Sequence, residues 1–442
     1  YKFPGHKFFS WSLSLSIAFP AYVYAFIYVG IFEYASPISE YLRNFNITLP
    51  QIKNIYGASV IMSMALFPYI FLLTKAHLRS VGIKSFKAAK SLGNNNITAI
   101  RKVIIPSLWP TIIAGMALVV FETIADFGGV STLRIETFTV GIYDAWFGYQ
   151  SYFSATRLAG YLLIFVFLIM FLAKYFGEKS SNLASKTAET FQRIETSPIV
   201  GLGVLFFCSF VFIIVFCIPT TQLIIWNLSD SSSNILSNLQ LLINSSIVGL
   251  LASVITVFFA IALALTYKHS NIFKSPILIS SSGYAIPGSV ISAGLLVGVD
   301  YVFNTSITFY GILGLIICLS LRFMTPAFNY ISASLSNISR SAENALTTQP
   351  KNSIKAFKLF YFPHMKPAIF LSLILVFIES IKEQPATLLL RPVGFDTLST
   401  KIYNFTSEGQ WEMAAAPSLF LIGMSLFFVY LINKNIDLNQ NK

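Results

Sequence analysis

The sequence is poor in charged residues and in cysteine, and each shortage argues against a class of protein. Only 11% of the 442 residues are charged, whereas 55% are hydrophobic. A soluble domain carries about 25% charged residues to cover its surface, so much of this chain must face lipid. The three cysteines lie inside apolar runs without the spacing of ligands, which argues against a disulfide framework or a zinc cluster.

The chain also lacks the Gly-x4-Gly-Lys-Ser/Thr loop that binds nucleotide phosphates. We therefore expect no ATPase site, no enzymatic activity and no bound cofactor in this chain. The net charge of +12 does not indicate a nucleic-acid partner, because the basic residues lie in loops between apolar runs. The four histidines are isolated in the sequence, so no metal site is assigned.

Long apolar runs dominate the rest of the sequence. A bilayer-spanning helix needs about 20 mostly apolar residues, and backbone polar groups in lipid are satisfied within helices. We therefore predict an all-α polytopic transmembrane bundle with about ten visible spans. These runs are 10–34, 55–76, 107–125, 154–175, 199–219, 241–266, 276–299, 308–330, 368–387 and 412–432. Four prolines should kink their runs, namely Pro20, Pro68, Pro287 and Pro326.

The loops between the runs differ in charge, and this difference predicts the topology. Segments 74–102 and 322–366 are rich in Lys and Arg, and together they contain one acid, Glu343. The alternate loops have few basic residues, and they are 36–53, 127–152, 220–240, 300–307 and 388–410. The positive-inside rule places the basic loops and both chain ends in the cytoplasm. We expect a multi-pass protein of the bacterial inner membrane.

An internal repeat divides the chain. Pro106-x3-Pro110 opens one run, and Pro363-x3-Pro367 opens another 257 positions later (363 minus 106). Two acids follow each element at matching spacings, Glu122 and Asp126 in the first copy and Glu379 and Glu383 in the second. Both copies follow basic loops, so the repeat is parallel.

The repeat predicts two halves of unequal length. The first half covers 1–176 with about four spans, a linker covers 177–198, and the second half covers 199–442 with about six spans. The runs 199–219 and 241–266 have no counterpart in the first half. We therefore expect two further helices before residue 1, about 12 spans in the intact protein.

The basic segment 80–106 contains a recognisable motif. Lys87-Ala88-Ala89 is followed by Gly93 and, nine residues later, by a hydrophobic stretch that ends in Pro106. Gly93 suits a left-handed helix end, and the asparagines after it suit the cap of another short helix. The motif resembles Glu-Ala-Ala-x3-Gly-x9-Ile-x-Leu-Pro of ABC importer permeases, with Lys87 in place of Glu. The resemblance implies that this loop docks on an ATPase subunit.

The second copy of the motif, in segment 331–366, departs further from the pattern. Counting back from Pro363 aligns Asn344 and Ala345 with the Glu-Ala pair and Pro350 with the glycine. The resemblance implies that this loop also docks on an ATPase. The alternative is that both segments are ordinary amphipathic cytoplasmic loops.

Two further stretches narrow the resemblance. Glu122-Thr-Ile-Ala-Asp126-Phe-Gly128 and Lys382-Glu383-Gln384-Pro385-Ala386-Thr387 resemble the fused two-half permeases of ferric-iron importers, which have Leu where Gln384 stands. The resemblance implies cytoplasmic ABC ATPase subunits that use ATP, and a periplasmic ferric-iron-binding protein that docks on 127–152 and 388–410. A thiamine or other small-solute permease, an ion-coupled secondary transporter and a non-functional remnant are the alternatives.

The four repeated acids are candidate residues of the translocation path. Glu122 and Asp126 are four residues apart, which predicts one helix face, and Glu379 and Glu383 repeat this spacing. Acids at lipid depth are costly and usually face a cavity or a partner, and Fe³⁺ favours oxygen ligands. The alternative is that they lie at outward helix ends, facing headgroups or paired with Lys382 or Arg391.

Overall fold

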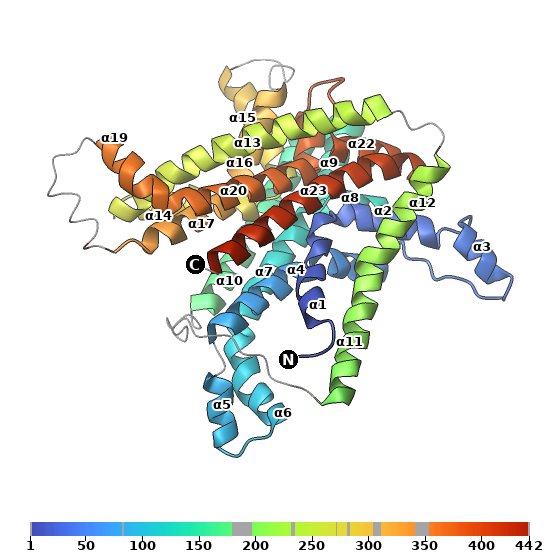
Figure 1. Ribbon diagram of the computed structural model, residues 1–442. Coiled ribbons are helices and arrows are strands. Elements are labelled where there is room, and N and C mark those ends of the chain that lie inside the picture. The colour runs from blue at the N-terminus through green and yellow to red at the C-terminus, as the bar shows by residue number, and fades with distance from the viewer. Residues whose placement is uncertain are drawn as a thin grey trace. The chain divides into compact units, whose positions relative to one another are not determined.

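The computed structural model describes residues 2–81, 84–178, 197–230, 235–270, 272–280, 283–303, 311–339, 341 and 353–440. Every regular element in these ranges is a helix, which confirms the predicted all-α class (Figure 1). Seven helices are long and apolar enough to cross a membrane, and the number rises to ten if each of three bent pairs counts as one span. The predicted number of about ten visible spans is therefore confirmed with the bent pairs included.

The chain forms two compact units. Unit 1 contains 1–136 and 161–229, and unit 2 contains 137–160 and 230–442. The units do not coincide with the sequence halves 1–176 and 199–442, because 199–229 lies in unit 1 and 137–160 lies in unit 2. Most of the linker 177–198 falls outside the described residues.

Unit 1 surrounds a buried helix. Its core helix α2 (Ala21–Phe32) contacts α4 (Ile55–Val81), α8 (Gly128–Thr132) and α12 (Ile218–Ser229). The side chains of Tyr24 and Phe26 on α2 are fully buried. The other elements that lie wholly in this unit are α1 (His6–Ser12), η1 (Leu15–Ala18), α3 (Pro37–Arg43), α5 (Lys84–Ser91), α6 (Asn96–Ala99), η2 (Ile100–Ile104), α7 (Ile105–Ala125), α11 (Pro198–Phe212) and η5 (Ile213–Cys217).

Two tyrosines attach the first helix of the second sequence half to unit 1. The hydroxyl of Tyr24 donates to the carbonyl of Val215 at 2.8 Å, and that of Tyr28 donates to the carbonyl of Ile214 at 2.6 Å. Both carbonyls belong to η5, a π-helical turn between α11 and α12. A π-turn disturbs the regular backbone ladder, so these carbonyls are available to the hydroxyls, which need partners when buried.

Unit 2 is organised around the long helix α13 (Ile235–His269), which lies beside α20 (Phe362–Lys382) and α17 (Met324–Ser336) (Figure 1). The contact between α13 and α20 is close because Gly249 on α13 has no side chain. A Cβ added there would lie 2.8 Å from Cγ2 of Ile381 on α20. The other elements are α9 (Phe138–Tyr143), η3 (Asp144–Gly148), α14 (Lys274–Ser280), η6 (Gly283–Ala285), α15 (Gly288–Phe303), α16 (Gly311–Arg322), α19 (Ser353–Ala356), η8 (Phe357–Tyr361), α21 (Pro385–Leu390), α22 (Leu398–Ser407) and α23 (Trp411–Gln440). Helix α10 (Tyr152–Glu178) has residues in both units.

Three of the four prolines that were expected to interrupt spans lie at helix breaks. Pro20 is the extended N-cap residue of α2, and Pro287 directly precedes α15. Pro326 follows the 49° bend between α16 and α17. Pro68, by contrast, lies inside α4, which is assigned as one continuous helix. Pro20, Pro287 and Pro326 therefore lie where helices begin, a position that suits a residue without a backbone N–H.

The internal repeat is visible in the helix boundaries. Helices α6, η2 and α7 begin at 96, 100 and 105, and α19, η8 and α20 begin at 353, 357 and 362. The same offset of 257 (353 minus 96) separates all three pairs. Each copy thus runs from a short helix through a π-helical turn into a long helix of 21 residues.

Candidate functional site

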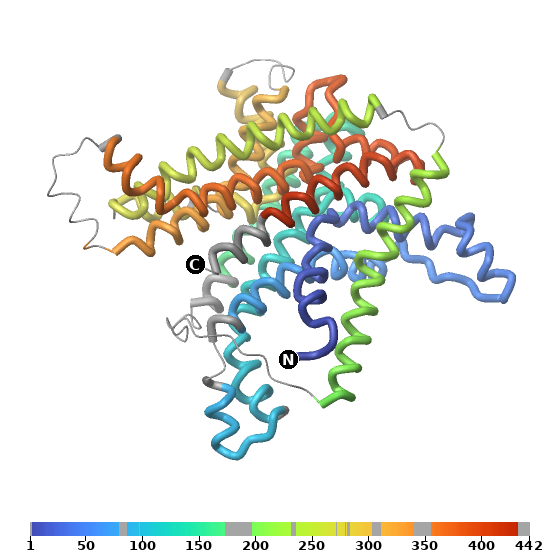
Figure 2. The backbone as a smooth tube through the Cα atoms, viewed as in Figure 1, coloured from blue at the N-terminus to red at the C-terminus, as the bar shows by residue number. Residues whose placement is uncertain are grey.

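The predicted first docking loop forms a small helical hairpin at the ends of α4 and α7. Its two short helices, α5 and α6, extend beyond those ends in Figure 2. Phe86, Ala89 and Ala99 form a buried cluster between them, and Ile104 is among the partly buried side chains packed on it. Ala89 is needed for this packing, because a larger side chain would separate the two helices.

Local hydrogen bonds close the turn of this hairpin. Gly93 has a φ of +84°, the left-handed conformation that ends α5, and its N–H donates to the carbonyl of Lys90 at 2.9 Å. The side-chain oxygen of Asn95 accepts from the N–H of Thr98 at 2.8 Å. Both features correspond to the roles that the sequence suggested for glycine and for the asparagines as a helix cap.

The outer surface of the hairpin carries the other motif residues. Lys87 and Ala88 are exposed, and Leu92 next to the turn has 83% of its surface exposed. Pro106 lies apart from them, in the first turn of α7. The structure therefore divides the motif into residues that build the hairpin and residues that face away from it.

The second docking loop is described only at its two ends. Asn344 and Ala345 lie outside the described residues. Pro363 occupies the first turn of α20, the position that Pro106 has in α7. At the other end of the loop, the ammonium of Lys268 donates to the carbonyl of Leu335 at 2.6 Å, which stabilises the C-terminal turn of α17.

The four repeated acids do not form i,i+4 pairs on helix faces, so that expectation was wrong. Helix α7 ends at Ala125 and α20 ends at Lys382, and the next residues, Asp126 and Glu383, are extended with ψ of 136° and 123°. Each of these acids turns instead toward the short helix that follows it. Asp126 accepts from the N–H of Val130 at 3.0 Å and so caps α8.

Both acids of the second copy have a basic partner. Glu379 pairs with Lys382 at 2.9 Å, as the alternative interpretation proposed. Glu383 pairs with Arg322 at 3.2 Å, and both side chains are almost fully buried. Arg391 pairs with Asp396, and not with either of the repeated acids.

Arg322 is the residue that the sequence interpretation missed. It was counted with the basic cytoplasmic segment 322–366, yet only 4% of it is exposed, and it ends α16 at the bend before α17. The available signal was its position inside the apolar run 308–330, where a charge is expected to have a partner.

The segment 384–398, which the sequence places outside the cytoplasm, is fixed by side-chain hydrogen bonds. Asn244 on α13 donates to the carbonyl of Asp396 at 2.8 Å, and Ser245 accepts from the N–H of Leu398, also at 2.8 Å. Thr397 caps α22 with a reciprocal capping box. The C-terminal end of the segment, residues 396–398, is therefore held against α13.

A pocket of about 340 Å³ lies beside this segment in unit 2. Its lining includes Asp230, Asn238, Asp396 and Lys401. Near it, burial lowers the pKa of Arg391, opposed by the neighbouring Tyr143. Burial also raises the pKa of Tyr143, whose ring contacts that of Tyr403 at 5.6 Å between centroids.

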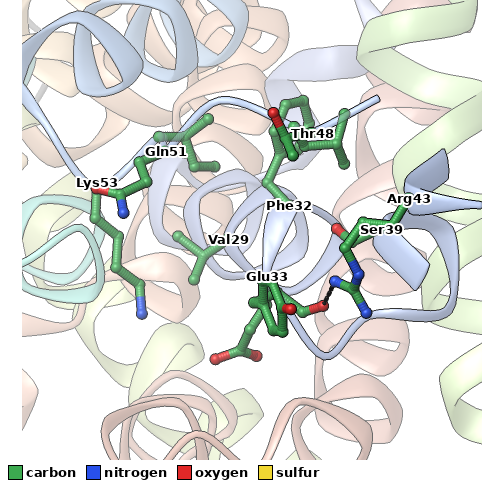
Figure 3. Close-up of a pocket in the computed structure, with 11 residues that line it drawn as sticks. Val29, Phe32, Glu33, Ser39, Arg43, Thr48, Gln51 and Lys53 are labelled. Atoms are coloured by element: carbon green, nitrogen blue, oxygen red, sulfur yellow. Dashed lines mark hydrogen bonds between the residues drawn. The ribbon is translucent and has the colours of Figure 1, made fainter. Parts of the chain in front are cut away.

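A second pocket, of about 370 Å³, lies in unit 1 where α2 leads into α3. Figure 3 shows Arg43 on one side of it and Lys53 on the other, with Glu33 at its lower edge. The guanidinium of Arg43 donates to the carbonyl of Tyr34 and lies over the tyrosine ring at 3.9 Å. None of the four repeated acids lines either pocket.

Comparisons with known proteins give a consistent result. Residues 1–182 match the family described as "Binding-protein-dependent transport system inner membrane component". The chain is 26% identical over 447 residues to the Fe(3+)-transport system permease protein FbpB 2 of Haemophilus influenzae, covering 98% of this chain and 84% of the relative. It is 23% identical over 407 residues to the ferric transport system permease protein FbpB of Actinobacillus pleuropneumoniae, of which it covers 58%.

A shorter match extends to permeases for another substrate. Over 130 residues the chain is 28% identical to the sulfate transport system permease protein CysT of Salmonella typhimurium, covering 29% of this chain and 46% of the relative. The two ferric-iron permeases match 98% and 85% of the chain.

Proposed function

We propose that this chain, a multi-pass inner-membrane permease of an ABC importer, carries ferric iron from a periplasmic binding protein into the cytoplasm. The observation that carries the proposal is the similarity to a Fe(3+)-transport permease along 98% of the chain. Energy comes from a separate ATPase subunit, because permeases of this class transport solute and leave ATP hydrolysis to their partners.

The hairpin of α5 and α6 is the proposed contact with the ATPase. Its buried cluster keeps the two short helices together, so that a force on one is passed to the other and into η2 and α7. Lys87, Ala88 and Leu92 present an exposed edge for a groove on the partner. The segment that contains Asn344 and Ala345 is proposed as the equivalent contact of the second half.

The outer loops are the proposed docking surface for the binding protein. In the segment 388–410, Val393 is fully exposed and Gly394 has a φ of +80°, so the turn projects from the hydrogen-bonded base. In the segment 127–152, Phe147 and Tyr149 are 47% and 81% exposed. Exposed aromatic side chains are enriched where proteins bind one another.

The repeated acids remain candidates for contact with the cation. Carboxylate oxygens suit Fe³⁺, a hard cation. Glu383 is buried, whereas Glu122, Asp126 and Glu379 are partly exposed. We therefore propose that these three acids contact the moving cation more directly than Glu383 does.

The test is uptake of radiolabelled ferric iron into vesicles that contain the permease, its ATPase and the loaded binding protein. We expect uptake that requires ATP and saturates with the binding protein. Uptake that is independent of ATP would assign the chain to ion-coupled transport instead. ATP-driven uptake of thiamine or sulfate without iron would keep the class and change the substrate.

A further inference from the structure

Three breaks in the helices of unit 2 occur around one point. Helix α15 begins at Gly288, α16 ends at Arg322 before a 49° bend, and α20 ends one residue before Glu383. Helix α15 contacts both α16 and α21, and α16 contacts α21. Broken helices place backbone polar groups inside the bundle, and these groups are tolerated only where other parts of the protein satisfy them.

A buried ion pair occupies this point. Nη1 of Arg322 lies 3.2 Å from Oε1 of Glu383, and about 5% of each side chain is exposed. The same carboxylate oxygen accepts from the N–H of Ala386, at 3.4 Å, in the first turn of α21. The pair therefore links the end of α16 to the start of α21.

The start of α15 packs directly on the ion pair. A Cβ added to Gly288 would lie 2.1 Å from Oε1 of Glu383 and 2.9 Å from Nη1 of Arg322. Only glycine allows the backbone to approach so closely. The pair is thus enclosed by all three interrupted helices.

The backbone of Glu383 extends the connection to the outer face. Its carbonyl accepts from the hydroxyls of Thr387 and Ser399, both at 2.9 Å. The next side chain, Gln384, donates to the carbonyl of Ser399 at 3.0 Å. The residue that Arg322 holds is therefore also the residue on which α22 is anchored.

The first sequence half has different residues at the positions of this ion pair. Pro68 and Pro326 also correspond in the repeat, at an offset of 258 (326 minus 68), one more than the offset between the Pro-x3-Pro elements. The same offset places Met64 at the position of Arg322 (322 minus 258), within the continuous helix α4. Asp126, the counterpart of Glu383, caps α8 and lies near Met62, because both would contact a Cβ added to Gly129. The residues of this ion pair therefore differ between the copies, because Met64 stands in place of Arg322 and Asp126 in place of Glu383.

We infer that Arg322 is a positioning residue for transport. Through Glu383 it joins α15, α16 and α21 into one rigid group, so that a displacement of α20 driven from the cytoplasmic side reaches the outer segment 384–398. The inference rests on the proposed function only in requiring an ATPase partner, and it does not depend on the substrate. Without the pair, the three breaks become hinges that absorb the displacement.

The test separates coupling from folding. Removing one partner of a buried pair leaves an uncompensated charge, whereas neutral replacements of both are often tolerated. We therefore compare the double variant Arg322→Gln with Glu383→Gln and the wild type in vesicles that also contain the ATPase and the binding protein. The measured quantity is the number of substrate molecules imported per ATP hydrolysed. The double variant is expected to assemble with a near-normal thermal midpoint and to import about tenfold less substrate per ATP.

Two further variants complete the design. Arg322→Lys keeps the charge but loses the planar guanidinium, so it is expected to assemble and to lose part of the coupling. Glu40→Gln, which neutralises an exposed acid of α3 outside the proposed path and docking surfaces, is the control, with a wild-type ratio expected. A wild-type import ratio in the double variant would overturn the inference. If the double variant does not assemble, the import ratio of Arg322→Lys is the test, and a wild-type ratio in that variant would overturn the inference.

The outcome is distinguishable from a failure of the proposed function. If the wild-type complex imports another solute, the ratio is measured with that solute and the inference is tested unchanged. If wild-type uptake ignores ATP, the importer class is wrong and the inference falls with it.

Discussion

The two copies of the repeat end their long helix at equivalent residues but stabilise that end in different ways. Asp126 caps the short helix after α7 through one backbone N–H and is partly exposed. Glu383 occupies the same place after α20, but it is buried against Arg322 and carries the anchor of α22 on its carbonyl. The backbone geometry has therefore been kept, while its charge environment has diverged.

The difference shows which part of the repeat is structural. The proline at the start of each span, the span of 21 residues and the extended acid after it occur in both copies. Each of these features depends on a local interaction with the backbone. The proline favours the first turn of its helix, and the acid side chain accepts from an N–H of the next helix. The ion pair depends on a single residue of another helix, Arg322, and Met64 occupies the corresponding position in the first copy.

The largest effect is expected from breaking the pair on one side. Arg322→Gln leaves the buried carboxylate of Glu383 without its partner, which should cost about 3–5 kcal/mol of stability. Thermal unfolding of the purified permease in detergent would measure this loss. A change below about 1 kcal/mol would mean that the pair behaves as a solvent-exposed one.

A smaller effect is expected on transport when one acid of each copy is neutralised. Glu122→Gln with Glu379→Gln should lower iron uptake about tenfold if these acids contact the cation, the equivalent of about 1.4 kcal/mol. Each single variant shows which copy contributes more. Normal uptake by a fully assembled double variant would remove these residues from the translocation path.

The next effect concerns the hairpin of α5 and α6. Gly93 has a φ of +84°, so Gly93→Ala should destabilise the turn by about 1–2 kcal/mol and weaken binding of the ATPase subunit. Co-purification of the ATPase with the permease measures this. Gly409→Ala, at a φ of +75° in unit 2, is the control, since it should strain the backbone equally and leave ATPase binding intact.

The smallest effect is expected at the counterpart of Glu383. Asp126→Asn keeps a good capping side chain, so the change in stability should be no more than about 0.5 kcal/mol. The same thermal unfolding assay applies. A loss as large as that of Arg322→Gln would show that the first copy also depends on a buried charge.

Much of the fold could be predicted from the sequence because the relevant signals are local. The apolar runs predicted the spans, the proline spacing predicted the repeat, and Gly93 was expected to adopt the left-handed conformation that it has. Each signal depends on a few neighbouring residues and on the membrane, which permits few backbone structures.

The parts that could not be predicted depend on distant contacts. The i,i+4 spacing of the acids suggested one helix face, but Asp126 and Glu383 end their helices by capping the next ones. The charge of Arg322 indicated a cytoplasmic loop, but Glu383 lies 61 positions away in the sequence and neutralises it inside the bundle. The pattern of hydropathy and charge along the chain does not indicate which distant residues form a pair.

The hydrogen bonds from Tyr24 and Tyr28 to η5 have a consequence for biosynthesis. Unit 1 needs α11 and α12, so it reaches its final packing only after the ribosome has made the linker and the first helix that follows it. Helix α9, which contacts α15 and α21, must wait even longer for its partners. Assembly in the membrane therefore cannot proceed strictly one half after the other, and the nascent first half must be held in the bilayer until its late helix arrives.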